Sequence, residues 1–187
     1  MPHCSNRFNS IIWRSYRHVP VAKLPYCQRQ WLLDRGSLTK RLIQASNGHF
    51  KVKVSRQTWA LPSLDERRLL KLPMGQRALV REVSLLCHGE VWVKARSIIP
   101  QATLTGVEKQ LANLGTRPLG AFLFKSKTMQ RGPLQIASFK NSEQLDLSAR
   151  RSVFFLHGKP ILVSEFFMPA VFAANSLLGT ENQSPEK

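Results

Sequence analysis

Acidic residues are scarce in this sequence. Its 187 residues include 11 Asp and Glu against 28 Lys and Arg, which gives a formal net charge of +17. Such a protein attracts anions of any size, from nucleic acids to small organic acids. The basic residues alternate with apolar ones, as in residues 51–54, and form no block of five or six like charges. Charge alone therefore does not choose the partner, and we do not expect a nucleic acid.

Long apolar runs are absent too. No segment approaches the roughly 18 uninterrupted apolar residues that a membrane-spanning helix needs, and we expect no integral membrane segment. The basic N-terminal stretch lacks an apolar core followed by a small-residue cleavage site, so it does not resemble a secretory signal. These absences predict a cytoplasmic protein.

Cysteine is rare, and Cys4, Cys27 and Cys87 have no C-x-x-C or Cys/His spacing. We expect free thiols and no metal site. The sequence also lacks the glycine-rich phosphate loops of nucleotide-binding proteins, the H-E-x-x-H of zinc hydrolases and the G-x-S-x-G of serine hydrolases. Any chemistry is therefore expected to need no cofactor.

The most informative stretch runs from Leu79 to Pro100. Residues 79–86 alternate with the period of a strand, residues 87–90 contain a glycine turn, and residues 91–99 read as a returning strand. On this pattern Arg81 shares a face with apolar side chains. The stretch predicts a hairpin that carries a cation on its apolar face.

A second hairpin is predicted from residues 152–156, a turn at residues 157–160 and a strand at residues 161–168. Glu165 lies among apolar neighbours there, as Arg81 does in the first hairpin. A buried isolated charge costs several kcal/mol or more, so each of the two needs a partner. The spacing alone favours a structural ion pair or a position at the sheet rim. The alternative is a pocket with a cation at one end and a carboxylate at the other.

The rest of the chain predicts helices and strands around these hairpins. We expect helices at residues 27–34, after an N-cap at Ser37, after a capping box at Ser63, and at residues 106–114 after a capping box at Thr105. Strands are expected at residues 50–54 and 134–140, a loop with free N–H groups at residues 118–120, and a polar connection at residues 141–150. This order predicts one α+β domain with a mainly antiparallel sheet flanked by helices. We expect it at residues 24–172, between a loosely ordered basic extension (1–23) and a polar tail (173–187).

Three segments together resemble the chorismate lyase family. They are LVREVSLLC (residues 79–87), LGTRPLG (114–120) and GKPILVSEFFMP (158–169). The family converts chorismate to 4-hydroxybenzoate and pyruvate for ubiquinone biosynthesis without a cofactor. The resemblance thus implies a cofactor-independent carbon–oxygen lyase with these small-molecule partners, inhibited by its product, and a monomer is expected.

The resemblance also implies roles for four residues. Arg81 would bind the ring carboxylate together with the backbone N–H groups of Leu38 and Leu119, whose side chains would act as lids. Glu165 would lie at the 4-oxygen of the ring. One departure is Ala95 before Arg96, where a glycine is expected, and it would tighten the cavity.

A different class of protein remains open. The UTRA effector domain of some transcription regulators resembles this fold and binds small acids without reacting with them. Such a domain normally follows a DNA-binding winged helix, and about 20 residues before Leu24 are too few to build one. This comparison favours the enzyme.

Overall fold

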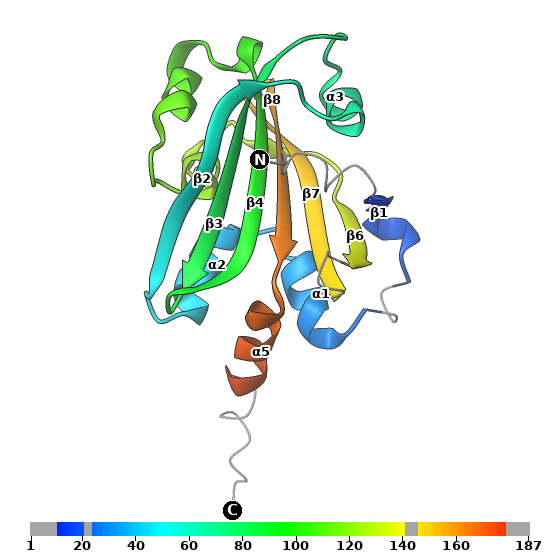
Figure 1. Cartoon of the computed structure of the whole chain (residues 1–187), viewed down its shortest axis with the longest axis vertical. Helices are drawn as coiled ribbons and strands as arrows, with labels where there is room; N and C mark the ends of the chain where they lie inside the picture. Colours follow the sequence, from blue (N-terminus) through cyan, green and yellow to red (C-terminus); the bar gives the residue numbers. More distant parts are fainter. Residues whose placement is uncertain (1–10, 21–23, 141–145, 179–187) are drawn as a thin grey trace, which may run out of the picture.

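One antiparallel sheet forms the body of the protein. The computed structural model describes residues 11–20, 24–140 and 146–178. The sheet has eight strands in the order β1-β6-β7-β8-β4-β3-β2, with β5 paired to β7 (Figure 1). Every pair of neighbours is antiparallel, so the predicted α+β class is confirmed.

The strands are β1 (Arg14–Ser15), β2 (Phe50–Ala60), β3 (Ala78–Cys87), β4 (Glu90–Pro100), β5 (Gln130–Arg131), β6 (Gln135–Lys140), β7 (Asp146–Leu156) and β8 (Lys159–Phe167). The α-helices are α1 (Tyr26–Leu32), α2 (Leu38–Ala45), α3 (Leu64–Leu70), α4 (Leu119–Lys125) and α5 (Pro169–Leu178). Three 3₁₀ helices are η2 (Tyr16–His18), η4 (Gln101–Thr103) and η5 (Gly106–Asn113).

Both predicted hairpins are present, and each closes with two residues in the left-handed region. His88 and Gly89 have φ of 51° and 81°, and His157 and Gly158 have φ of 48° and 76°. Positive φ at both central residues is the geometry of the tight turns whose twist suits a hairpin. The second turn is shorter than predicted, because residues 159 and 160 already belong to β8.

The polar connection predicted at residues 141–150 is wrong for its second half, which belongs to strand β7. Its first part, residues 141–145, lies outside the described residues. Arg150 and Arg151 are both buried in β7 and point to opposite faces of the sheet, where each finds a carboxylate. Such partners cannot be read from the sequence around them, so the polar pattern suggested a loop.

The sheet has two covered faces. Leu70 of α3 packs with Val80, Ile98 and Leu162 on one face. On the other face, α1 and α2 cover one end of the sheet, and η5 and α4 cover the other end. At that second end, Ile99 of β4 packs with Leu111 of η5 and Leu123 of α4. Neighbouring residues of one strand, such as Ile98 and Ile99, therefore belong to different cores, as the two-residue repeat of a strand requires.

Two of the three predicted N-caps, at Ser37 and Ser63, are confirmed. The Ser37 hydroxyl accepts a hydrogen bond of 3.3 Å from the Lys40 N–H at the start of α2. At α3, the Ser63 N–H donates to the Glu66 carboxylate over 2.9 Å, as a capping box requires.

Two predictions in the next part of the chain are wrong. Residues 106–113 form the predicted helix, which is of the 3₁₀ type, but the side chain of Thr105 does not cap it, so the predicted capping box is wrong. Glu108, expected to close the capping box, instead contacts His157 and Lys159 at 2.7 and 2.9 Å, because two basic groups compete for its carboxylate. The loop predicted at residues 118–120 is the start of α4, with Pro118 as its N-cap.

The structure also describes parts of the two predicted terminal segments. In the N-terminal one, β1 pairs with β6 and η2 follows it. In the C-terminal one, residues 173–178 continue α5 below the sheet (Figure 1). Within the described ranges, no helix is long and apolar enough to cross a membrane.

Candidate active site

A partly enclosed cavity lies between the sheet and the starts of α2 and α4. The space between its lining atoms, open solvent included, is about 620 Å³. Apolar side chains such as Val83, Leu85 and Val163 form its floor on strands β3 and β8, and Leu123, Phe124 and Phe154 form one side. A pocket that is mostly apolar with a few polar groups is typical of a small-molecule site.

All four residues singled out in the sequence line this one cavity, although they come from four elements. Arg81 lies on β3 and Glu165 on β8, while Leu38 and Leu119 are the first residues of α2 and α4. The first N–H groups of a helix have no partner inside the helix. The N–H groups of Leu38 and Leu119 therefore remain available for the same reason in both helices.

Arg81 is buried, with only 2% of its surface exposed. Its guanidinium donates to the Gln57 side-chain oxygen and the Gly115 carbonyl over 2.8 Å each, and to the Arg117 carbonyl over 3.3 Å. Burial lowers the pKa of Arg81 from its usual value. All these partners are neutral, so they orient the guanidinium without neutralising its charge.

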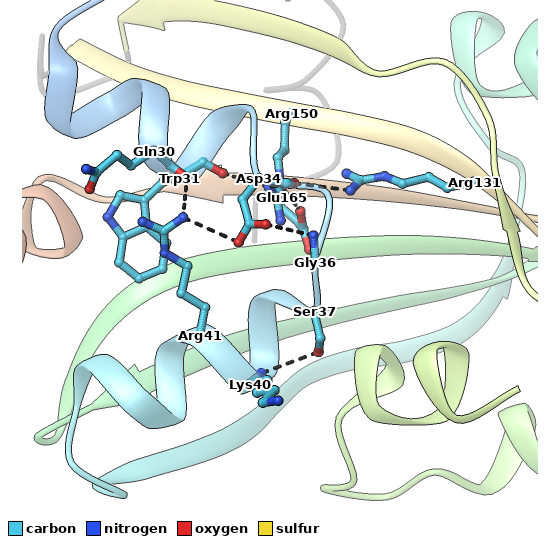
Figure 2. A network of polar contacts seen from close by, with 10 residues as sticks. All are labelled: Gln30, Trp31, Asp34, Gly36, Ser37, Lys40, Arg41, Arg131, Arg150 and Glu165. Carbon is cyan, nitrogen blue, oxygen red and sulfur yellow. Dashed lines mark hydrogen bonds and ion pairs between the residues drawn. The ribbon is translucent and has the colours of Figure 1, made fainter.

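Glu165 has a partner that the sequence analysis missed. The Arg150 Nε donates to the Glu165 carboxylate over 2.5 Å. The same guanidinium donates to the carbonyls of Trp31 and Asp34 over 2.6 and 2.7 Å (Figure 2). The loop after α1 thus fixes Arg150, and Arg150 fixes Glu165.

Spacing alone favoured a structural ion pair or a position at the sheet rim. Glu165 does form an ion pair, with Arg150, but among the described residues Arg81 and Glu165 do not pair with each other. Arg81 lies opposite Ser97 and Glu165 lies opposite Ala95 in the sheet ladder. Across the sheet, the two residues are separated by two strand spacings of about 4.8 Å each. Along the strands they are offset by two residues of about 3.3 Å each, so their Cα atoms lie about 12 Å apart. The two groups therefore face the cavity from separate positions, as the alternative hypothesis of a pocket requires.

Arg131 and Gln57 were also missed. Arg131 lines the cavity from β5, and Gln57 holds Arg81 from the far end of β2. Neither lies in a clear sequence pattern, because β5 has only two residues and Gln57 follows a bulge between Val54 and Arg56. The one available signal was the absence of acids near Arg131 in the sequence.

The helix starts that cover the cavity touch one another. A Cβ added at Gly120 would lie 2.8 Å from the Thr39 hydroxyl, which is closer than real Cβ atoms approach. Glycine thus allows α2 and α4 to meet over the cavity. Ala95 of β4 lines the cavity below these helix starts. The resemblance to the chorismate lyase family predicted glycine at this position.

Comparison with protein families identifies the chain at this point. Residues 8–177 match the model of the chorismate lyase family. The chain belongs to this family. A relative from Methylococcus capsulatus is 42% identical over 76% of this chain and 95% of its own length, and one from Marinobacter nauticus is 40% identical over 84% and 87%. Both carry the name "Probable chorismate pyruvate-lyase".

Solved structures with a similar fold come from transcription regulators. The C-terminal domain of the histidine utilization repressor from Pseudomonas syringae matches 65% of this chain and 92% of its own, with a TM-score of 0.53 and 8% identity. The ligand-binding domain of a protein assigned to the GntR family, from Bordetella bronchiseptica, matches 65% and 86%, with a TM-score of 0.51 and 14% identity. At such identities the likeness concerns the fold alone.

Proposed function

We propose that this protein is a chorismate pyruvate-lyase, which converts chorismate to 4-hydroxybenzoate and pyruvate. The observation that carries the proposal is the convergence of Arg81, Glu165 and the first residues of α2 and α4 on one cavity in a chain of this family. Composition and fold alone would fit other small-acid-binding proteins equally well.

Binding of the ring carboxylate is assigned to Arg81. Its guanidinium has no acid beside it, and a guanidinium can hold a carboxylate with two parallel hydrogen bonds that also fix the ring plane. The N–H groups of Leu38 and Leu119 add two donors from the covering helices. The three groups together orient the ring over the apolar floor.

The reaction breaks the bond between C3 of the ring and the ether oxygen, and C4 loses its proton. The ring becomes aromatic, and the enolpyruvate that leaves takes up a proton to become pyruvate. The step is redox-neutral and needs no further reactant. The protein therefore has to orient the ether, exclude water and transfer a proton.

Glu165 is proposed to act at the 4-oxygen and the C4 proton. The sequence left open whether it is protonated and donates a proton. In its ion pair with Arg150 it is a carboxylate, and a carboxylate accepts. We therefore assign to it the acceptance of the 4-hydroxyl hydrogen bond or of the C4 proton, with Arg150 holding the resulting geometry.

Product retention follows from this division of roles. The ring carboxylate and the 4-oxygen both survive in 4-hydroxybenzoate, so the product keeps the contacts of the substrate ring. Contacts equal in substrate and product do not speed the chemical step, and a cavity covered by two helix starts has to open before the ring leaves. We expect 4-hydroxybenzoate to inhibit strongly and its release to limit turnover.

The test is incubation of purified protein with chorismate, with 4-hydroxybenzoate and pyruvate measured separately. Equal amounts of both products support the lyase, and rapid mixing should give a burst of 4-hydroxybenzoate followed by slow turnover. Tight binding of 4-hydroxybenzoate without turnover of chorismate would instead support the effector-domain class that shares the fold. A linear trace without a burst would leave the lyase but reject slow product release.

A further inference from the structure

The charges of the cavity do not cancel. Its charged lining residues are Glu165 and three arginines, Arg81, Arg131 and Arg150. The carboxylate of Glu165 forms an ion pair with Arg150. With Glu165 ionised the lining carries a net charge of +2, which sits on the two remaining guanidinium groups.

Arg131 is held in place by neutral groups. Its Nε donates to the Ser152 hydroxyl over 3.1 Å, its Nη1 donates to the Asp34 carbonyl over 3.2 Å, and its guanidinium carbon lies 5.1 Å from the centre of the Phe154 ring. Among the ion pairs of the described residues none includes Arg131. Burial lowers its pKa, as it does for Arg81, and the nearby charge of Arg150 acts in the same direction, whereas the carboxylates of Glu165 and Asp34 act against this shift.

The two unneutralised cations lie on opposite sides of Glu165. The sheet order runs from β3 with Arg81, through β4, to β8 with Glu165 and on to β7, whose partner β5 carries Arg131. Figure 2 shows the head group of Arg131 directed toward Arg150 and Glu165 from a different strand. A ligand that reaches both free arginines therefore passes the carboxylate of Glu165.

We propose that Arg131 binds the second carboxylate of a dianionic substrate. The inference rests on the proposed function and extends it. Chorismate carries one carboxylate on the ring and one on the enolpyruvyl group, and Arg81 is assigned to the first. Arg131 takes the second, holds the side chain that leaves, and loses its ligand when pyruvate departs.

Arg131 also lines a second pocket, which is separate from the cavity. The other basic residues that line this pocket are Arg17, His18 and Arg35. Arg35 is exposed and donates to the Tyr16 hydroxyl over 3.0 Å. It carries the same charge in the same neighbourhood but does not line the cavity, which makes it the matched control for Arg131.

The experiment uses two ligands that cannot react. 3-(Carboxymethoxy)-4-hydroxybenzoate has both carboxylates, and its side-chain amide has only the ring carboxylate. A charge-assisted hydrogen bond of ordinary strength predicts that the wild-type protein binds the diacid at least about 10-fold more tightly than the amide. Calorimetric titration of both ligands measures this ratio.

Four variants test which residue causes the preference for the diacid over the amide. Arg131→Gln should lower the ratio to about one and leave the affinity for the amide and for 4-hydroxybenzoate within about threefold. Arg35→Gln should keep the ratio, and Arg81→Gln should weaken both ligands together. Arg131→Lys retains a charge and should keep part of the preference.

Two results overturn the assignment. One is equal binding of diacid and amide by the wild-type protein, which needs no folded variant. The other is an unchanged ratio in a folded Arg131→Gln protein. Turnover of chorismate by the wild type is a separate measurement, so a missing preference in an active enzyme rejects Arg131 alone. A preference that depends on Arg131 in a protein without turnover supports the site and rejects the lyase.

Discussion

On the face of the sheet that α3 covers, the half-buried Arg96 and the buried Arg151 have carboxylates beside them, whereas on the cavity face two arginines contact only neutral groups. Arg96 bonds Glu66 over 2.7 Å and Glu82 over 2.5 Å, and Arg151 contacts Asp65. These pairs join α3 to the sheet. Arg81, which is more deeply buried than either, has carbonyl and amide oxygens around it.

The difference teaches how to separate structural from ligand-binding charges. A buried cation with acids around it is already neutralised, and removing it leaves those acids unpaired. A buried cation with only neutral partners is fixed in position but still attracts an anion. The same residue type thus joins α3 to the sheet on one face, and on the other face it is proposed to bind the ligand.

Substitution of Arg81 gives the largest expected effect on activity. Arg81→Ala should lower kcat/KM for chorismate by about 100-fold or more, since two charge-assisted hydrogen bonds to the ring carboxylate are lost. Arg81→Lys should restore activity only in part, because an ammonium group cannot reproduce the planar two-donor contact. Steady-state kinetics and circular dichroism measure activity and folding together. If Arg81→Ala unfolded while the activity per folded molecule stayed unchanged, Arg81 would be a structural residue like Arg96 and Arg151.

Arg96 should behave in the opposite way. Arg96→Met leaves Glu66 and Glu82 unpaired under α3, so we expect a loss of about 3 kcal/mol in the free energy of unfolding. The KM for chorismate should stay within about twofold, because Arg96 does not line the cavity. Urea unfolding followed by tryptophan fluorescence gives the first quantity. A folded Arg96→Met protein with a large rise in KM would show that the faces are not separate.

How far the sequence predicts this molecule depends on the range of each interaction. Hairpins and N-caps follow from neighbouring residues, so the turns at His88 and His157 and the caps at Ser37 and Ser63 could be predicted. The partners of Glu165 and Glu108 come from 15 and about 50 residues away. Such contacts are set by strand register, which no local pattern contains. The positions of Arg131 and Arg150 in the cavity were missed for the same reason.

Glu108 extends the comparison to the end of the second hairpin. Hydrogen bonds from Lys159, and to a smaller extent from His157, lower its pKa from 4.5 to about 2. A lowered pKa in the folded state stabilises the protein above pH 4.5, and this contribution is lost as the pH falls toward 2. Glu108→Gln should lower the free energy of unfolding by about 2 kcal/mol at pH 7. Urea titrations at several pH values should show the difference from wild type shrink as the pH falls from 4.5 toward 2; a constant difference would reject the ion pairs as its cause.

Ala95 gives the smallest expected effect. Ala95→Gly removes one methyl group from the cavity wall, so the ring of the ligand should be held less tightly. We expect the inhibition constant of 4-hydroxybenzoate to rise by about fourfold, since a buried methyl group contributes roughly 0.8 kcal/mol. Competition assays against chorismate measure this constant. A fall in the constant would mean that Ala95 restricts the ring instead of packing on it.

The contact between Thr39 and Gly120 joins the two covering helices into a single gate. If the cavity opens by separating α2 from α4, neither helix start can move outward without breaking this contact. We therefore expect the amide hydrogens of both helix starts to exchange with water in one cooperative opening, at a common rate. A ligand bound to the N–H groups of Leu38 and Leu119, as proposed, should slow this exchange at both helix starts at once, so hydrogen–deuterium exchange would measure how long the product stays bound.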